Sequence, residues 1–327
     1  MPRSGDTAHT ASQAATTDPR ATTTDRSARH RPMRAVVQVV RGFAMGSADL
    51  VPGVSGGTIA LVFGIYDDLV AEIYAASSAV GRLLRLDVDG GWRALRDVRW
   101  GFLVPLVAGI GLAVVTLAGV LRTLLADRPV LMSALFFGLI VGSIVVASDE
   151  LDRRDPPRLA IVTAVAAATF VLLGLRGAAM RDPGLAVMFA GGALAITAMI
   201  LPGVSGSFLL LMIGLYQHLL DVVHERGAVE LAVFTAGAAT GLAVFSAALH
   251  WLLEHHRATV MATLIGLMAG SLRVLWMWPT DQGGVGDVRL GAPFWADVPM
   301  VLAAAMVGAV GVVVIARLGL RRDEPSR

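Results

Sequence analysis

The sequence contains neither cysteine nor lysine and is poor in charged residues. Without cysteine the chain has no disulfide, no thiolate metal site and no thiol nucleophile. All 27 basic residues are therefore arginine. Charged residues make up 16% of the chain, against about 25% in soluble proteins, and the mean hydropathy is +0.69. This composition excludes an ordinary soluble domain.

Long apolar runs take the place of the missing charge. Seven runs are long enough, or nearly so, to cross the ~30 Å hydrocarbon core of a bilayer as helices, so we predict an all-α polytopic membrane protein. They are residues 101–121, 130–147, 159–175, 185–201, 231–253, 258–278 and 298–316. Two further apolar segments, 35–51 and 53–75, are interrupted by Arg41, Asp49 and Asp67.

One motif occurs twice. The stretch LVPGVSGGTIALVFGIY at residues 50–66 returns as ILPGVSGSFLLLMIGLY at residues 200–216, with eight of seventeen positions identical. A weaker match links GLIVGSI from Gly138 with GLMAGSL from Gly266. A duplication with segments interrupted by Gly and Pro at matching positions indicates a transporter binding site.

The duplication predicts two membrane repeats, each with a lead-in segment, a PGVSG segment and three long helices. The expected limits are a disordered cytoplasmic tail at 1–34, repeat 1 at 35–177, a linker at 178–184, repeat 2 at 185–317 and a cytoplasmic tail at 318–327. Whether the PGVSG segments re-enter or cross fully, each repeat crosses an odd number of times, so the repeats have inverted topology.

Length favours a re-entrant, broken-helix hairpin over a full crossing. The 14 residues from Gly53 to Tyr66 span only about 21 Å as a helix, less than the hydrocarbon core. With the N-terminus inside, 19 arginines fall on inside segments and 6 on outside segments, as the positive-inside rule expects. Both termini are therefore expected in the cytoplasm, and the two PGVSG turns should meet near the midplane.

The PGVSG turns form the predicted binding site, because non-helical backbone at membrane depth must be buried in protein or line a cavity. Helices starting near Val54 and Val204 would offer free N–H groups to an anion such as phosphate. Serines can cap such helices or bind a ligand oxygen, and glycines let a ligand approach the backbone. Alternatively, the glycines only allow close helix packing. The predicted substrate-binding residues are Arg41, Asp49, Pro52, Gly53, Ser55, Gly56, Gly57, Thr58, Pro202, Gly203, Ser205, Gly206 and Ser207.

Charges near the turns are expected to be functional, since ionisable residues are costly inside a membrane. Arg41 and Asp49 precede the first turn, whereas Gly191 and Met199 occupy the matching positions before the second. The predicted site is therefore chemically asymmetric. Alternatively, Arg41 and Asp49 pair with each other and hold the hairpin together. Arg273 is expected to extend towards the membrane surface rather than to bind phosphate.

Polar residues also follow the tyrosine of each motif. They are Asp67, Asp68 and Glu72 in the first copy and Gln217, His218 and Asp221 in the second. We expect them at solvated helix ends, with no basic partner for the acidic cluster. Alternatively, Asp67 or His218 could relay a coupling proton.

The segments GSADLVPGVSGGTIALVFGIYDDL and LPGVSGSFLLLMIGLYQHL resemble the paired signatures of the bacterial polyprenyl-phosphate transporter family, formerly a domain of unknown function. The resemblance covers roughly residues 35–317 and extends to the binding residues named above. The family pattern often has an acidic residue after each tyrosine, which Asp67 retains and Gln217 does not.

The resemblance implies a flippase for undecaprenyl phosphate or a related polyprenyl phosphate in the bacterial cytoplasmic membrane. Such transport recycles the lipid carrier of cell-wall and surface-glycan synthesis. The expected partners are this lipid and the bilayer, with a proton or sodium gradient and a homo-oligomer left open. We expect no cofactor, no metal and no nucleic acid.

Other functional classes remain to be weighed. An ion-coupled secondary transporter of a small soluble anion has the same design, but it would have an aqueous vestibule instead of an opening to lipid. A membrane enzyme needs a nucleophile with its base, or a metal-binding carboxylate cluster, and the sequence offers neither clearly. We therefore expect no enzyme. A role as a passive scaffold would not explain why the helix breaks are duplicated.

Overall fold

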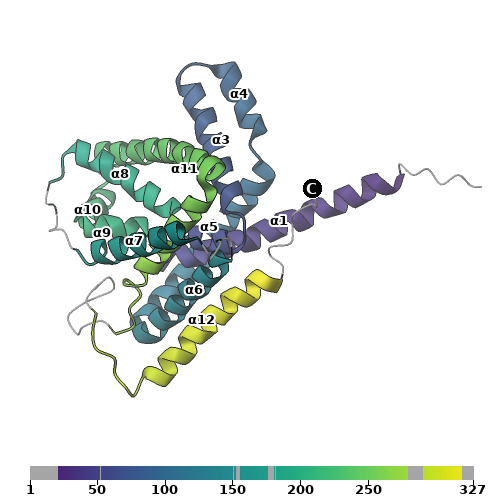
Figure 1. Cartoon of the computed structure of the whole chain (residues 1–327). Coiled ribbons are helices and arrows are strands. Elements are labelled where there is room, and N and C mark those ends of the chain that lie inside the picture. Colours follow the sequence, from purple (N-terminus) through teal and green to yellow (C-terminus); the bar gives the residue numbers. More distant parts are fainter. Residues whose placement is uncertain are drawn as a thin grey trace, which may run out of the picture.

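A computed structural model describes residues 21–51, 53–149, 151, 155–175, 180, 182–278 and 290–318. Within these residues the regular structure is helical, which confirms the predicted all-α class (Figure 1). The helices are α1 Ala21–Asp49, α2 Gly56–Val62, α3 Tyr66–Leu84, α4 Val88–Asp97, α5 Trp100–Asp127, α6 Pro129–Ser148, α7 Pro156–Leu172, α8 Leu185–Ile200, α9 Gly206–Met212, α10 Tyr216–Glu225, α11 Ala228–Ser271 and α12 Val298–Leu318.

Among the described residues, four helices are long and apolar enough to cross a membrane: α5, α6, α11 and α12. The pair α9–α10, bent by 108°, would make a fifth span or a re-entrant loop. Large apolar side chains face outwards from these helices, with Val115 on α5 84% exposed and Met306 on α12 65% exposed. Lipid contact accounts for such a surface, so the chain is a multi-pass membrane protein.

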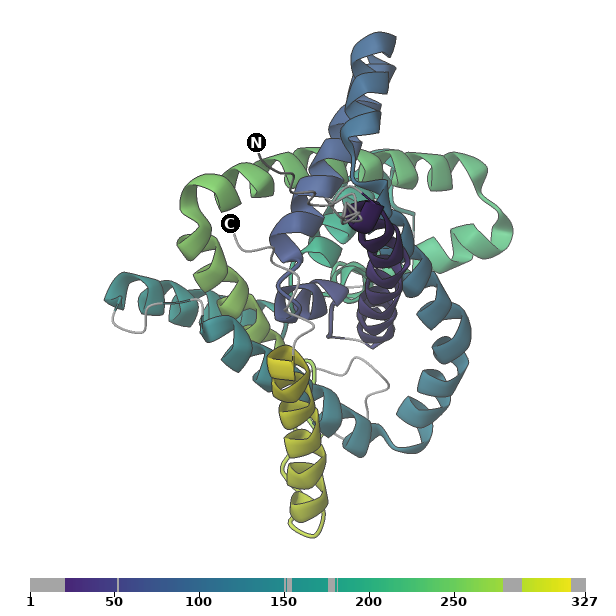
Figure 2. The same ribbon diagram turned by 90° about the vertical axis from the view of Figure 1, so that its right-hand side faces the viewer.

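The predicted helices 231–253 and 258–278 are one helical run, α11, rather than two helices joined by a loop. Only His256 has non-helical backbone, with φ −136° and ψ 34°, and the ribbon turns in this region (Figure 2). A straight helix of these 44 residues would be about 66 Å long, twice the hydrocarbon core, so the bend lets α11 supply two spans. The run ends at Ser271, earlier than predicted.

The segments predicted as tails and loops contain more helix than expected. The backbone at 21–34, predicted to be disordered, forms the start of α1. Extending a helix from an apolar segment costs far less than nucleating one, which explains the difference. The predicted arginine-rich loop 80–100 contains α4, which forms a hairpin with α3 (Figure 1). Residues 1–20, 319–327 and part of the predicted linker 178–184 lie outside the described residues.

Glycines place the backbones of four helix pairs in close contact. In the first lead-in, a Cβ on Gly42 of α1 would overlap the Leu106 carbonyl of α5. In the second, a Cβ on Gly192 of α8 would overlap the Phe234 carbonyl of α11. Gly42 and Gly192 are equivalent in the duplicated sequence, so the two lead-in segments pack in the same way.

The other two pairs link one sequence half to the other. Gly138 and Gly142 of α6 face the backbone of α12, while Gly266 and Gly270 of α11 face α7. These glycines occupy equivalent positions in the matching GLIVGSI and GLMAGSL segments. Each segment therefore packs against the last helix of the other half, and the two halves interlock.

Replacing Gly138 by alanine should destabilise the protein, because the added Cβ would overlap the Ala305 carbonyl of α12. We expect Gly138→Ala to lower the free energy of unfolding by about 1–3 kcal/mol. The matched control is Gly119→Ala, where a Cβ has nothing within 4 Å. Removing a helical glycine there should raise stability by up to about 1 kcal/mol. Melting temperatures in detergent that are equal for both variants would contradict the packing described.

Candidate binding site

The described residues of the two PGVSG turns share two backbone features. Gly53 has φ +85° and Gly203 has φ +83°, a region that favours glycine. In each copy the valine after the Pro-Gly pair donates its N–H to the carbonyl three residues earlier, at 3.1 Å in the first and 3.4 Å in the second. Positive φ at the third position of a turn with proline at the second is typical of type II. Pro52 itself lies outside the described residues.

Each turn leads into a helix of only seven residues, α2 or α9, whose N-cap is Ser55 or Ser205. These helices begin two residues later than predicted. Both end in a glycine with positive φ, Gly64 at +68° or Gly214 at +78°, with the two hydrogen bonds of a Schellman motif. The stretch from Gly53 to Tyr66 is therefore not helical throughout, as its length estimate of about 21 Å assumed. The sequence did contain a signal for this helix end, because both copies of the motif have a glycine at this position.

The structure brings the two turns into direct contact, as we expected. Three hydrogen bonds join the segment of the first turn to that of the second. They run from Gly203 N–H to Thr58 Oγ1 at 3.0 Å, from Ser55 Oγ to Met199 O at 3.2 Å, and from Tyr66 Oη to Ile200 O at 3.2 Å. Side chains of the first segment thus hydrogen-bond to backbone groups that the second helix break leaves without an intrahelical partner.

Tyr66 is a part of this contact that the sequence analysis missed. Its side chain is buried, and its hydroxyl reaches the end of α8. The signal was available, since a tyrosine closes both copies of the motif. What the sequence did not indicate was the partner, a backbone carbonyl more than a hundred positions away.

The N-terminus of the first short helix is already occupied by protein groups. Gly56 N–H donates to the Asp49 carboxylate at 2.6 Å, and Gly57 N–H donates to Ser55 Oγ at 3.2 Å. The third N–H, that of Thr58, donates to the Ser55 carbonyl at 2.9 Å. An anion, the Asp49 side chain, therefore already sits at this helix start.

The second short helix is more open. Ser205 Oγ lies 3.0 Å from Ser207 Oγ and makes no cap hydrogen bond, so only one of the two predicted serine caps is formed. Ser207 is exposed, and Met199 takes the place equivalent to Asp49. Within the described part of the chain, no hydrogen bond is recorded for the N–H groups of Gly206 and Ser207. Pro202, Gly203 and Gly206 are buried beneath them.

Arg41 lies on α1 and is 4% exposed. For Asp49 the structure shows a different partner from the one in the pairing alternative, the N–H of Gly56. Eight positions along the continuous helix α1 separate Arg41 from Asp49 by about 12 Å.

The acidic residues after Tyr66 are ion-paired, not simply solvated. Asp67 lies 2.8 Å from Arg257, next to the bend in α11. Arg99, at the start of α5, bridges Asp68 at 2.7 Å and Glu72 at 2.5 Å, and Glu72 is only 7% exposed. The expectation that nothing pairs with this cluster is wrong. Both arginine partners are distant in the sequence, which is why pattern alone did not find them.

Two further polar side chains take unexpected positions. His218 Nε2 lies 3.9 Å from a carboxylate oxygen of Glu230, in the first turn of α11. Arg273 follows the end of α11 and stacks its guanidinium 4.7 Å from the ring centre of Phe170. The sequence did not indicate this cation–π partner for Arg273.

A family model described as undecaprenyl phosphate translocase-like matches residues 45–287. A polyprenyl-phosphate transporter of Vibrio cholerae is 37% identical over 239 residues, which cover 73% of this chain and 77% of the relative. A polyprenyl-phosphate transporter of Staphylococcus aureus is 30% identical over 253 residues, which cover 72% and 84%. No solved structure matches.

Replacing Thr58 by valine should loosen the contact between the turns. The change keeps the shape of the side chain but removes the acceptor of Gly203 N–H, which is buried. An unpaired buried donor costs about 1–3 kcal/mol of folding free energy. The control is Thr163→Val on the exposed face of α7. We expect its free energy of unfolding to stay within about 0.5 kcal/mol of wild type. Equal melting temperatures for both variants would contradict the assigned contact.

Proposed function

The chain belongs to the undecaprenyl phosphate translocase-like family, and on that premise we propose that it carries undecaprenyl phosphate, or a related polyprenyl phosphate, across the bacterial cytoplasmic membrane. It is a transporter rather than an enzyme. In this role it returns the lipid carrier of cell-envelope glycan synthesis from the outer to the inner leaflet. Both termini lie in the cytoplasm in this proposal.

The observation that carries the proposal is the direct contact between the two PGVSG turns. We place the lipid phosphate between them. At the first turn, a carboxylate from Asp49 already accepts a backbone N–H of α2. The second turn shares the two backbone features of the first but has Met199 instead of the carboxylate. A bound phosphate would fill this equivalent place and accept from Ser205, Ser207 and the N–H groups beside them.

The two turns then have different roles. Ser55, Gly57 and Thr58 join the first turn to the second, while the accessible hydroxyls of Ser205 and Ser207 contact the lipid phosphate. Arg41, buried on α1, adds positive potential to this region, which matters more at low dielectric than in water. Chemical asymmetry of this kind suits a lipid that presents only one phosphate.

The inverted arrangement of the repeats is part of the same proposal. Repeat 1 at 35–177 and repeat 2 at 185–317 would each enter the membrane with a broken hairpin, from opposite sides. The interlocked pairs α6–α12 and α7–α11 support this arrangement, because equivalent segments make equivalent contacts. Two hairpins meeting from opposite leaflets give a site that can be reached from either side.

A coupling gradient, of protons or sodium, is a further part of the proposal. Asp67 is one candidate, because its ion pair with Arg257 ties α3 to the bend of α11. Protonating Asp67 would remove the charge that holds this link. His218, facing Glu230, is the other candidate. A homo-oligomer is compatible with the exposed apolar helix faces but is not required for the site.

The transport proposal predicts that variants at the turns lose activity in proteoliposomes. Movement of a fluorescent polyprenyl phosphate between leaflets should be protein-dependent. Each lost hydrogen bond to a charged phosphate costs about 1.5–3 kcal/mol, so Ser205→Ala/Ser207→Ala should slow transport by at least about tenfold. Arg41→Ala and Ser55→Ala/Ser205→Ala should also be slower. Ser78→Ala, whose hydroxyl only bonds back to α3, is the matched control.

The same assay distinguishes the alternatives. No movement by the wild type, with or without a proton or sodium gradient, would refute the lipid substrate and favour a small soluble anion instead. If a proton gradient drives transport, Asp67→Asn or His218→Gln should abolish that dependence. Asp221→Asn, exposed on α10, should retain it.

A further inference from the structure

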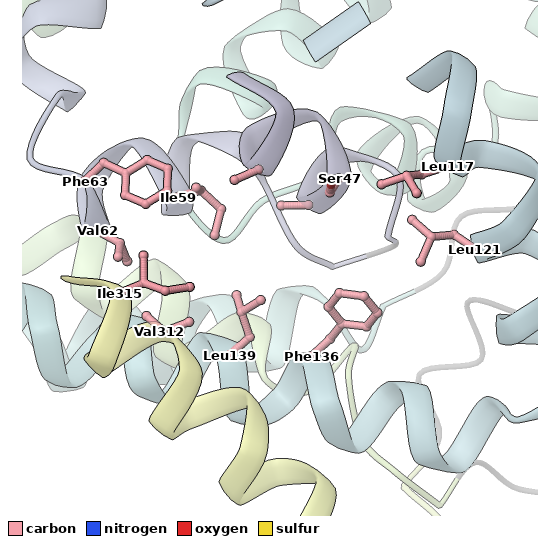
Figure 3. Close-up of a pocket in the computed structure, with 12 residues that line it drawn as sticks. Ser47, Ile59, Val62, Phe63, Leu117, Leu121, Phe136, Leu139, Val312 and Ile315 are labelled. Carbon is pink, nitrogen blue, oxygen red and sulfur yellow. The ribbon is translucent and has the colours of Figure 1, made fainter. Parts of the chain in front are cut away.

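An apolar cavity of about 250 Å³ lies beside α2, between the helix pairs α1–α5 and α6–α12. We call it the α2 cavity. Its lining includes Ile59, Val62 and Phe63 of α2, Leu121 of α5, Phe136 of α6 and Ile315 of α12. Figure 3 shows these side chains converging from different helices on one space. The sequence motifs did not indicate this cavity, because its walls come from both halves of the chain.

The lining of the α2 cavity offers nothing to a polar ligand. Its one polar residue is Ser47, whose hydroxyl donates to the Phe43 carbonyl at 2.7 Å. Water in such a space would lack hydrogen-bond partners, and cavities of this kind stay dry and bind apolar molecules. A soluble anion is excluded as the occupant for the same reason.

The cavity reaches the outer apolar surface of the protein. The cavity is only partly enclosed, and Ile315 of α12, which lines it, is 44% exposed. On α5, Val114 shares the helix face of Leu117 and Leu121 and is 42% exposed. A hydrocarbon chain could therefore extend from the cavity into lipid without crossing a polar surface.

The cavity also begins next to the paired turns. Ala48 lines it and directly precedes Asp49, the residue that bonds to Gly56 N–H. Ile59 lines it one helical turn, about 5 Å, beyond Gly56. Thr58, the residue before Ile59, accepts the N–H of Gly203, so this contact links the cavity wall to the second turn, where we place the phosphate. The first carbons of such a lipid would lie at the cavity.

We propose that the α2 cavity binds the first isoprenyl units of the transported lipid, an inference that rests on the proposed function. Ligand pockets usually measure about 300–1,000 Å³, so this one holds only the proximal part of a long chain and leaves the rest in the bilayer. Double bonds and methyl branches leave an isoprenyl chain fewer rotatable bonds than a saturated chain. It loses less entropy when it is held, which favours a prenyl over an acyl occupant.

A pair of competitors with the same headgroup tests the proposal. Farnesyl phosphate is prenyl, whereas dodecyl phosphate is saturated and unbranched along a backbone of matching length. We expect farnesyl phosphate to inhibit polyprenyl phosphate transport more strongly. Ala44→Phe places a ring in the cavity and should weaken inhibition by farnesyl phosphate about tenfold or more. Ala303→Phe, exposed on the outer face of α12, is the control and should behave as wild type.

A second measurement needs no variant and so does not depend on whether Ala44→Phe folds. A polyprenyl phosphate with a photoreactive diazirine on its first isoprenyl unit should label wild-type peptides that line the cavity, which contain residues 44–48, 59–63, 117–121, 136–139 or 312–315. Labelling confined to other helices would overturn the proposal, as would equal inhibition by farnesyl and dodecyl phosphates. If the wild type moves no polyprenyl phosphate, the proposed function fails too. If transport is intact but farnesyl phosphate inhibits Ala44→Phe and Ala303→Phe equally, only the proposal for the cavity is refuted.

Discussion

The contact between two broken helices is the constraint on which the rest of the structure depends. Each PGVSG turn interrupts a helix inside an apolar protein, where an unsatisfied backbone group costs several kcal/mol. Here side chains of the first segment satisfy backbone groups at the second break: the Thr58 hydroxyl accepts from Gly203, and the Ser55 hydroxyl donates to the carbonyl of Met199. Neither half can make these bonds alone, so both copies of the motif are needed in one fold.

The helix pairs that pack through glycine hold the two halves of the chain together and so stabilise this contact. Small residues let the backbones of α6 and α12, and of α7 and α11, approach closely, and each pair joins one half of the chain to the other. The end of α11 and the residues that follow it also pack on the turns, with Met268 against Gly203 and Val274 against Gly53. The framework thus holds the turns together, and a ligand between them would face fixed groups rather than a flexible loop.

Much of the fold could be predicted from the sequence, because lipid-facing helices and a duplicated motif leave strong local signals. The apolar runs, the Pro-Gly break before each short helix and the serine cap of the first one are local features of this kind. Long-range partners were not predictable. Asp49 reaching Gly56, Arg99 bridging Asp68 and Glu72, and Tyr66 reaching α8 all depend on tertiary placement. The continuity of α11 was also missed, since a polar His255–Arg257 segment suggests a loop.

The asymmetry between the turns gives the site its chemistry, and it can be tested directly because the chain contains no cysteine. Ser205→Cys provides a single thiol at the second turn, and Ser78→Cys provides one on α3. The rate of alkylation by a small soluble reagent should fall at position 205 as polyprenyl phosphate is added, following the concentration dependence of transport. The rate at position 78 should stay constant. Unchanged alkylation at position 205 under saturating lipid, with transport intact, would contradict a phosphate site at the paired turns.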